Sequence, residues 1–322
     1  MRIYRSLEEI AAVPDRARVI AIGTFDGVHL GHRRIIRMAV DAAAELEGIA
    51  TVVTFDPHPR QVLRPGEAPR ILTGLGRKAR LLEEIGVHEM AVIPFDLRLA
   101  ALSPAEFCKE LLSEGLGSRQ VMVGENFRFG KGGTGGPADL LSLGEEYGFS
   151  VTVLRMIEDG GGVVSSTRIR QYVQEGRVEE VANLLGRPYA LEGRVVRGAG
   201  RGKDLGIPTA NVEVGPEVAT PALGAYVTRS SVDGEPVLPS VTSVGTNPTF
   251  EEHGHVRVET HILDFSRGVY GSTLETEFLV HLREQIKFND PAVLVDRIRE
   301  DVREAAEYFA RGGGSVGFMS RR

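Results

Sequence analysis

The chain has 322 residues, a length that suits two domains of about 150 residues each. It has 42% hydrophobic and 25% charged residues and a net charge of −6, a composition typical of a soluble protein. That charge argues against a protein that binds nucleic acid through phosphate neutralisation, whereas a nucleotide-sized ligand needs only a few local donors. No segment reaches the roughly 18 apolar residues of a membrane helix, and no secretory signal is recognised. A single cysteine, Cys108, excludes an intrachain disulfide and indicates a cytoplasmic protein.

The first half of the chain alternates strand-like and helix-like segments. Apolar runs and helical spacing predict, in order, a strand at 18–23, a helix at 31–46, a strand at 49–55, a helix at 75–85, a strand at 90–94, a helix at 103–114, a strand at 119–123, a helix at 137–147 and a strand at 150–154. Cys108 lies on the apolar face of the helix at 103–114, so we expect a buried thiol. Repeated strand–helix units predict a parallel sheet with helices on both faces, whose ligands lie beyond the carboxyl ends of the strands.

The pattern changes near residue 186. Residues 166–185 predict one or two helices, which end before Gly186 and Pro188. Segments 189–196, 224–231, 256–263 and 274–282 then alternate with period two between turns, and about 291–309 has helical periodicity. We therefore predict an α/β domain at 1–186, a mostly antiparallel β-barrel domain with a C-terminal helix at 187–310, and a flexible tail at 311–322.

A loop with two histidines follows the first predicted strand. It reads GTFDGVHLGH over 23–32 and opens the first helix. A helix N-terminus attracts phosphate, and glycine lets the backbone approach a ligand. His29 and His32 would then donate hydrogen bonds to phosphoryl oxygens. Taken without its position, such a pair is also typical of surface or metal-binding histidines. No Walker A sequence is present, so this half would hold phosphate by another device.

The second half contains a glycine-rich basic segment, GAGRGKDLG over 198–206. Such a segment is typical of a flexible loop and also suits a loop that closes over polyphosphate. Thr209 and Asn211 follow it with neutral oxygens that suit Mg²⁺. Glu259 lies on the polar face of the strand near 256–262, between Arg257 and His261. It is either a general base or a solvated surface carboxylate.

Taken together, these motifs resemble the prokaryotic bifunctional riboflavin kinase/FMN adenylyltransferase (FAD synthetase) family. The segments that carry the resemblance are, in order, GTFDGVHLGH (23–32), TFDPHP (54–59), LTGLGRKARLL (72–82), VGENFRFGKGGTG (123–135), SSTRIR (165–170), GKDLGIPTAN (202–211), VGTNPTF (244–250), VETHILDF (258–265), VYG (269–271) and LREQIKFND (282–290). The resemblance covers roughly residues 1–308. It implies a Rossmann-like nucleotidyltransferase domain followed by a riboflavin kinase barrel.

The resemblance implies roles for residues of the first domain. His29 and His32 would stabilise the α-phosphate of ATP while the phosphate of FMN attacks it. The nucleotide would be bound by Gly23, Phe25, Asp26, Gly31, Asn126, Ser165, Ser166, Thr167 and Arg170. The Ser and Thr residues before a helix are, by themselves, also typical of a simple N-cap.

For the second domain the resemblance implies a kinase site. Thr209 and Asn211 would hold Mg²⁺, with Gly202 and Lys203 at the nucleotide. Glu259 would activate the ribityl hydroxyl of riboflavin, and Arg283 would lie near the flavin.

The expected function is therefore FAD synthesis from riboflavin by way of FMN, with ATP as co-substrate. An alternative within enzymes is a nucleotidyltransferase for another phosphate-bearing acceptor, with a second domain that only binds flavin. A flavin-sensing regulator without catalysis is disfavoured because His29, His32 and Glu259 are all present. The expected partners are riboflavin, FMN, FAD and ATP, without nucleic acid or membrane, in a monomer or weak homo-oligomer.

Overall fold

The structure is a computed structural model that describes residues 1–13, 17–198, 207–246, 256–287 and 290–313. Contacts divide the chain into two compact units, Met1–Ser166 and Thr167–Arg322. Most of the helical segment predicted at 166–185 thus belongs to the second unit, and the domain boundary at residue 186 stays a prediction. Of the tail predicted at 311–322, the structure describes only Arg311–Gly313.

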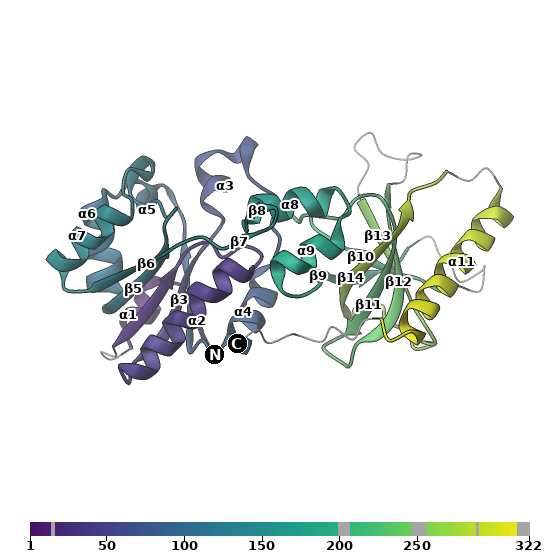
Figure 1. Cartoon of the computed structure of the whole chain (residues 1–322), viewed down its shortest axis with the longest axis horizontal. Coiled ribbons are helices and arrows are strands. Elements are labelled where there is room, and N and C mark those ends of the chain that lie inside the picture. The colour runs from purple at the N-terminus through teal and green to yellow at the C-terminus, as the bar shows by residue number, and fades with distance from the viewer. Residues whose placement is uncertain (14–16, 199–206, 247–255, 288–289, 314–322) are drawn as a thin grey trace. The chain divides into compact units, whose positions relative to one another are not determined.

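The first unit is a parallel sheet between helices (Figure 1). Its strands are β1 (Arg2–Tyr4), β2 (Arg18–Ile22), β3 (Ile49–Asp56), β4 (Glu89–Pro94), β5 (Ser118–Gly124) and β6 (Ser150–Leu154), with a small hairpin of β7 (Glu158–Asp159) and β8 (Gly162–Val163). Its helices are α1 (Leu7–Ala11), α2 (Leu30–Glu45), α3 (Pro59–Leu63), η1 (Pro65–Glu67), α4 (Leu75–Ile85), α5 (Leu97–Ala101), α6 (Pro104–Glu106), η2 (Phe107–Gly115), η3 (Lys131–Gly133) and α7 (Pro137–Tyr147).

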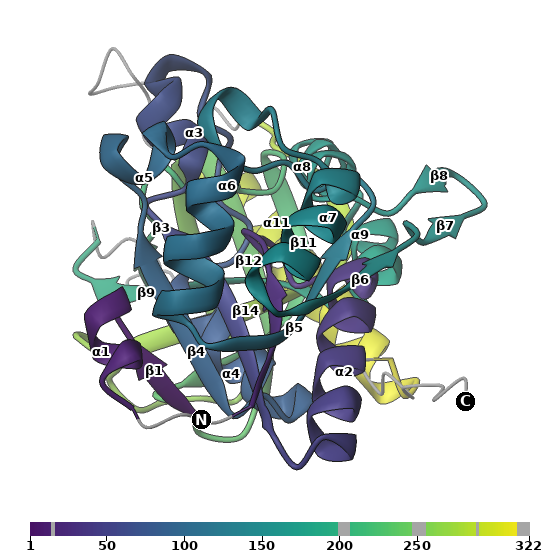
Figure 2. The ribbon, with the colours of Figure 1, turned by 90° about the vertical axis from the view of Figure 1, so that its left-hand side faces the viewer.

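Strand β2 lies at the centre of this sheet, whose order is β1-β4-β3-β2-β5-β6 with every pair parallel. Alternate residues of β2 enter two different cores: Val19 packs with α2 and α4, and Ile20 packs with α1 and η2. Figure 2 views this unit with its helices about the sheet. Burial on both faces explains why the strands read as continuous apolar runs. Cys108 is fully buried in the second of these cores, as predicted.

A buried ion pair joins the strands at the edge of the sheet opposite to the ligand edge. Arg18 Nε donates to Glu89 Oε2 at 2.9 Å, and the two side chains are 3% and 2% exposed. Thr51 Oγ1 donates to the same carboxylate oxygen, and the Arg18 guanidinium also donates to the carbonyl oxygens of Leu116 and Ile10. Because these hydrogen bonds compensate for the loss of water around the two charges, the pair is tolerated in the core.

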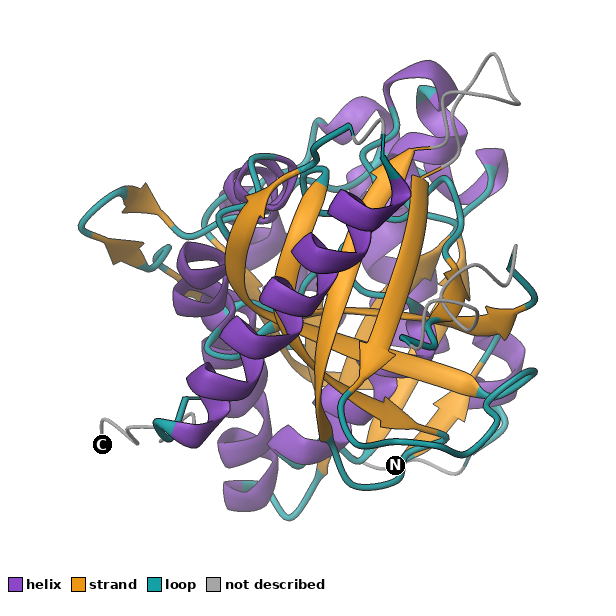
Figure 3. Cartoon of the chain, turned by 90° about the vertical axis from the view of Figure 1, so that its right-hand side faces the viewer, coloured by secondary structure: helices purple, strands orange, loops and turns teal. Residues whose placement is uncertain are grey.

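The second unit is a closed antiparallel barrel that carries helices. Its strands are β9 (Tyr189–Val196), β10 (Ala210–Glu213), β11 (Gly224–Val232), β12 (Leu238–Thr246), β13 (Val256–Ile262) and β14 (Thr273–Glu284), in the order β10-β13-β12-β11-β14-β9. Its helices are α8 (Ser166–Gln174), α9 (Val178–Leu185) and α11 (Pro291–Ala310). Figure 3 shows α11 lying across the barrel strands, where it contacts β11 and β12. The predicted fold class, α/β and then β-barrel with a C-terminal helix, is confirmed.

A chain of hydroxyl groups crosses the barrel interior. Thr242 Oγ1 lies 2.8 Å from Thr228 Oγ1 and 2.9 Å from Thr260 Oγ1, and Ser240 Oγ lies 2.8 Å from both Thr228 Oγ1 and Ser230 Oγ. These five side chains are at most 1% exposed. A two-residue slip of one strand keeps the inward and outward faces but breaks these pairs, so the hydroxyls help to set the strand register.

We expect Thr242→Val to lower the free energy of unfolding of the barrel by about 1–3 kcal/mol, because two buried hydroxyls lose a partner. Denaturant unfolding measures the change. Thr273→Val, at an exposed position that begins β14, is the matched control and should change it by less than about 0.5 kcal/mol. Equal values for the two variants would show that the hydroxyl chain contributes nothing.

Candidate active sites

The first candidate site lies where the chain changes direction in the parallel sheet. From β2 the chain proceeds to β3 and β4 on one side, then returns to β5 on the other side of β2. Loops that follow the two strands at such a switch point form a ligand crevice. The loop after β2 is residues 23–29, which we call the histidine loop, and the loop after β5 contains Asn126.

His29 caps helix α2. Its Nδ1 accepts a hydrogen bond from the backbone N–H of His32 at 3.3 Å, and its side chain is 3% exposed. With Nδ1 as an acceptor, the proton of the neutral ring is on Nε2, which is therefore the nitrogen able to donate to a phosphoryl oxygen. A side chain at Gly31 would meet the His29 ring, since a Cβ there lies 3.1 Å from His29 Cε1.

The two histidines act as a stacked pair. Their ring centroids are 3.5 Å apart with planes at 20°, and the Phe25 ring lies nearly perpendicular to the His32 ring with centroids 5.2 Å apart. The stack lies at the first turn of a helix of 16 residues, where unpaired N–H groups and the helix dipole favour an anion. The predicted pairing of both histidines with a helix N-terminus is present in the structure.

Two other residues predicted at the nucleotide have internal contacts. Phe25 is 2% exposed and packs into the core beside α2 and against His32. Asp26 is 3% exposed, and its carboxylate accepts hydrogen bonds from the backbone N–H groups of Leu72 and Thr73 at 3.0–3.1 Å. Both side chains therefore fix the histidine loop against the rest of its unit. Local sequence did not indicate this role.

The segment around Ser165 also reaches the histidine loop. Ser166 Oγ donates to the carbonyl oxygen of Asp26 at 2.9 Å, and the Val164 carbonyl oxygen lies 3.9 Å from a Cβ built at Gly31. Ser165 is half-buried beside it. Thr167 and Arg170 follow within the first five residues of α8. The structure thus brings segments 140 residues apart to one place.

Two predicted residues remain at the ligand edge of the sheet. Gly23 directly follows β2, and a Cβ there would lie 3.3 Å from the Phe25 ring. Asn126 is exposed beyond the end of β5, with Oδ1 3.1 Å from a Cβ built at Gly124.

The second candidate site is on the outward face of the barrel. Asn211 of β10 is directly opposite Glu259 of β13, and Glu259 is also opposite Ser243 of β12. Val258 and Thr260 are buried while Glu259 is half-buried, so the predicted division of this strand into two faces is correct. Cross-strand partners on one face have Cβ atoms about 4.5–5.5 Å apart, which brings the amide and the carboxylate together.

The segment that contains Thr209 is bound to β13 through Pro208. His261 Nδ1 lies 2.8 Å from the carbonyl oxygen of Pro208, and because a carbonyl only accepts, this nitrogen donates. The bond ties the segment before β10 to β13. Thr209 directly precedes β10, two residues before Asn211.

Side-chain oxygens of the chemical types that bind magnesium lie on and beside this face. Thr209, Asn211 and Glu259 present a hydroxyl, an amide and a carboxylate, and Mg²⁺ takes one or two protein oxygens with phosphate oxygens and water. A Cβ at Gly198 would lie 2.7 Å from Asn211 Oδ1, so this glycine leaves the space that the amide fills. Within the described ranges, no group of three or more His, Cys, Asp or Glu side chains could hold a metal by itself. Gly202 and Lys203 lie outside the described residues.

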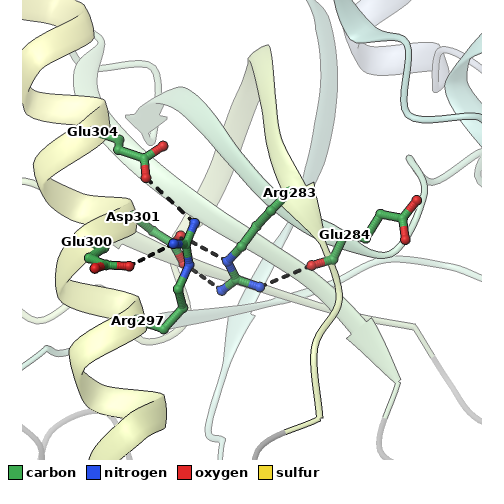
Figure 4. Close-up of polar contacts among 6 residues, drawn as sticks. All are labelled: Arg283, Glu284, Arg297, Glu300, Asp301 and Glu304. Atoms are coloured by element: carbon green, nitrogen blue, oxygen red, sulfur yellow. Dashed lines mark hydrogen bonds and ion pairs between the residues drawn. The ribbon is translucent and has the colours of Figure 1, made fainter.

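Arg283, predicted near the flavin, has a carboxylate partner within its own unit (Figure 4). Its Nε and Nη2 donate to the two oxygens of Asp301 on α11 at 2.9 and 2.6 Å, and Asp301 is 2% exposed. Arg297 Nε lies 3.3 Å from the same carboxylate. The contacts fix α11 against β14, and the flavin role of Arg283 stays a prediction.

Sequence reasoning did not single out Lys78, which contacts the backbone of the histidine loop. It is 6% exposed on α4, and its Nζ donates to the carbonyl oxygen of Thr24 at 2.7 Å. The available signal was a lysine three residues after Leu75 and four before Leu82, on the apolar stripe of a helix.

Comparison with known proteins matches the two parts of the chain to two enzyme families. The FAD synthetase family model matches residues 12–168, and the riboflavin kinase family model matches residues 185–309. The chain belongs to the bifunctional riboflavin kinase/FMN adenylyltransferase family. Relatives of that name include those of Listeria monocytogenes, 36% identical over 92% of this chain and 94% of the relative, and Escherichia coli, 34% identical over 96% and 98%.

A solved structure from Streptococcus pneumoniae, described as a macrolide-efflux protein, is also similar to this family member. The two share 30% identity and a TM-score of 0.83 over 94% of this chain and 98% of the other. In the part of the chain that the structure describes, no helix has both the length and the apolar character needed to span a membrane.

Proposed function

We propose that the chain converts riboflavin to FMN at the barrel site and FMN to FAD at the histidine-loop site, consuming one ATP at each. The observation that carries this proposal is the opposition of Asn211 and Glu259 on one outward face, in a chain whose other unit presents His29 and His32 at a helix N-terminus. Each arrangement suits one of the two phosphate chemistries of the family.

In adenylyl transfer, a phosphate oxygen of FMN attacks the α-phosphorus of ATP, and the bond to the β-phosphate oxygen breaks to release diphosphate. The attacking oxygen is already anionic, so no general base is required. His29 Nε2–H, His32 and the N-terminus of α2 stabilise the negative charge that develops on the α-phosphoryl oxygens. We propose that Gly23, Gly31, Asn126, Ser165, Ser166, Thr167 and Arg170 contact the nucleotide, and that Phe25 and Asp26 act by shaping the histidine loop.

In the kinase reaction, the ribityl 5′-hydroxyl oxygen attacks the γ-phosphorus of ATP, and ADP leaves. Glu259 accepts the hydroxyl proton as the new bond forms. Thr209 and Asn211 would hold Mg²⁺, which neutralises charge on the phosphates. We place Gly202 and Lys203 at the nucleotide and Arg283 near the flavin by family resemblance, as part of the same proposal.

Incubation with riboflavin and Mg-ATP tests the whole proposal. We expect chromatography over time to show FMN first and FAD after it. FAD formed from supplied FMN, with riboflavin unconsumed, would support instead a nucleotidyltransferase whose second domain only binds flavin. We further propose a cytoplasmic protein that acts on these small molecules without nucleic acid or membrane, as a monomer or weak homo-oligomer.

The domain arrangement has its own test. We propose an adenylyltransferase domain at 1–186, a kinase domain at 187–310 and a tail at 311–322. A fragment of residues 187–322 should fold and form FMN but no FAD. Because α9 contacts β9 and β14, a fragment of residues 167–322 should be more stable, which thermal unfolding measures. A folded 187–322 fragment without kinase activity would contradict the proposed boundary.

A further inference from the structure

The histidine loop has a backbone that its own sequence does not favour. Phe25 and Val28 have φ angles of 45° and 42°, and Gly27 has a φ of 85°. The left-handed region costs a residue other than glycine roughly 1–2 kcal/mol, and a β-branched valine there is a genuine outlier. Such a conformation persists only where the surroundings hold it. The loop that carries His29 therefore depends on contacts from other elements.

Contacts from several other elements hold this loop. The N–H groups of Leu72 and Thr73 bind the Asp26 carboxylate, and Ser166 Oγ binds the Asp26 carbonyl oxygen. A further contact comes from α4: Lys78 Nζ donates to the Thr24 carbonyl oxygen at 2.7 Å and to Thr54 Oγ1 at 3.3 Å. Lys78 thus fixes the peptide at which the chain leaves β2 and enters the strained residues.

A lysine is a costly choice for this position. Burial lowers the pKa of Lys78, while the nearby carboxylates of Asp26 and Asp56 raise it. If this position only had to be filled, methionine or leucine would be more favourable, because each occupies a similar volume without a buried charge. Thr54 Oγ1 also donates to the Thr24 carbonyl oxygen, at 3.0 Å, so this oxygen would keep a donor without Lys78. Neither packing nor the satisfaction of this carbonyl oxygen requires the ammonium group, which adds a second and charged donor at the same peptide.

We propose that Lys78 is a positioning residue for adenylyl transfer, which holds the start of the histidine loop so that His29 and His32 meet the α-phosphate. This inference rests on the proposed function of that site. Lys78 acts through Thr24 and the loop rather than by touching substrate. Its contribution is realised in the transition state, where histidine placement matters most, so it should affect kcat more than KM.

The test is Lys78→Met in the full-length protein, which keeps the apolar stem and removes the ammonium group. We expect kcat for FAD formation from FMN and ATP to fall about 10- to 100-fold, the loss that a small misplacement of catalytic groups causes. The KM values for FMN and ATP should change by less than about threefold. Riboflavin kinase activity, measured on the same sample, should be unchanged.

The matched control is Lys109→Met, the same substitution at a lysine that is 56% exposed on η2 of the same unit. It should leave both activities at the wild-type level. If the wild-type protein itself forms no FAD, the proposed function fails. If wild type is active and Lys78→Met keeps kcat within twofold, only the inference about Lys78 fails.

Stability separates positioning from a merely structural role. A lysine whose pKa is lower folded than unfolded binds fewer protons in the folded state at pH values between the two, so its effect on stability improves as pH rises. Below that pH window the buried charge lowers the stability of the folded protein, and Lys78→Met removes this destabilisation. We therefore expect its Tm at pH 7 to equal or exceed that of Lys109→Met. A Tm several degrees lower, with kcat per folded molecule unchanged, would overturn the proposal.

Lys78→Arg provides a second variant. It retains a cation and N–H donors at this position, so we expect it to recover at least part of the kcat lost in Lys78→Met. Its activity is measured per folded molecule, at a temperature where the unfolded fraction is negligible. Equal kcat values for the Arg and Met variants would show that the charge is not what positions the loop.

Discussion

Glu259→Gln should lower riboflavin kinase activity by roughly 10²–10⁴-fold, the contribution typical of general base catalysis. A ribityl hydroxyl is a poor nucleophile until a base accepts its proton. Glutamine keeps the size and hydrogen-bonding capacity of the side chain and removes its basicity. Added FMN should still become FAD at close to the wild-type rate, because the histidine loop belongs to the other compact unit.

A matched control for this variant is Glu213→Gln on β10. Glu213 is exposed and two residues from Asn211, so both side chains lie on the same side of their strand. The control should phosphorylate riboflavin as wild type does. Riboflavin, FMN and FAD are separated by chromatography after a fixed time with Mg-ATP. Kinase activity of Glu259→Gln within a few-fold of wild type, in folded protein, would make Glu259 a solvated strand carboxylate.

The predicted α/β unit agrees closely with the structure because its strands are buried on both faces. The apolar run predicted as a strand at 18–23 is β2 (Arg18–Ile22), and the helix predicted at 75–85 is α4 with the same bounds. The missed strand β1 has only three residues and pairs solely with β4 at one edge of the sheet. Three residues give too short a sample for period two to be recognised.

The barrel was harder to predict because part of its interior is polar. Strand β12 (Leu238–Thr246) was missed although Ser240 and Thr242 are fully buried. These hydroxyls satisfy one another across strands, so the buried positions carry no hydrophobic signal. Hydropathy identifies buried apolar side chains. The partner of a buried hydroxyl lies on another strand, so local sequence does not reveal it.

The candidate sites show the same limit. The position of His29 and His32 at the helix start followed from local sequence, since a strand, a glycine-containing loop and a helix are consecutive. The partners of Asp26 lie 46 and 47 residues away, and the carboxylate that binds Arg283 lies 18 residues away on α11. The family resemblance predicts roles for Asp26 and Arg283, whereas only the fold shows which groups bind their charges.

His29→Ala and His32→Ala should each lower FAD formation by about 10²–10³-fold, the loss typical when a donor to transition-state charge is removed. FMN formation should be nearly unchanged. His29 also caps α2, and loss of a cap costs about 0.5–2 kcal/mol of stability. His29→Asn separates the two effects, because asparagine is a strong N-cap but lacks the imidazole Nε2–H.

His88→Ala is the matched control for the histidine variants. His88 Nδ1 also accepts a backbone hydrogen bond, from Ala50 N–H at 3.0 Å, but His88 immediately precedes β4, at the amino edge of the sheet. We expect this control to form FAD as wild type does. His29→Asn should remain as inactive as His29→Ala, but its Tm should return to the wild-type value. If His29→Asn instead regains the wild-type rate, the imidazole serves only as a helix cap, and the donor to the α-phosphate is another group of the site.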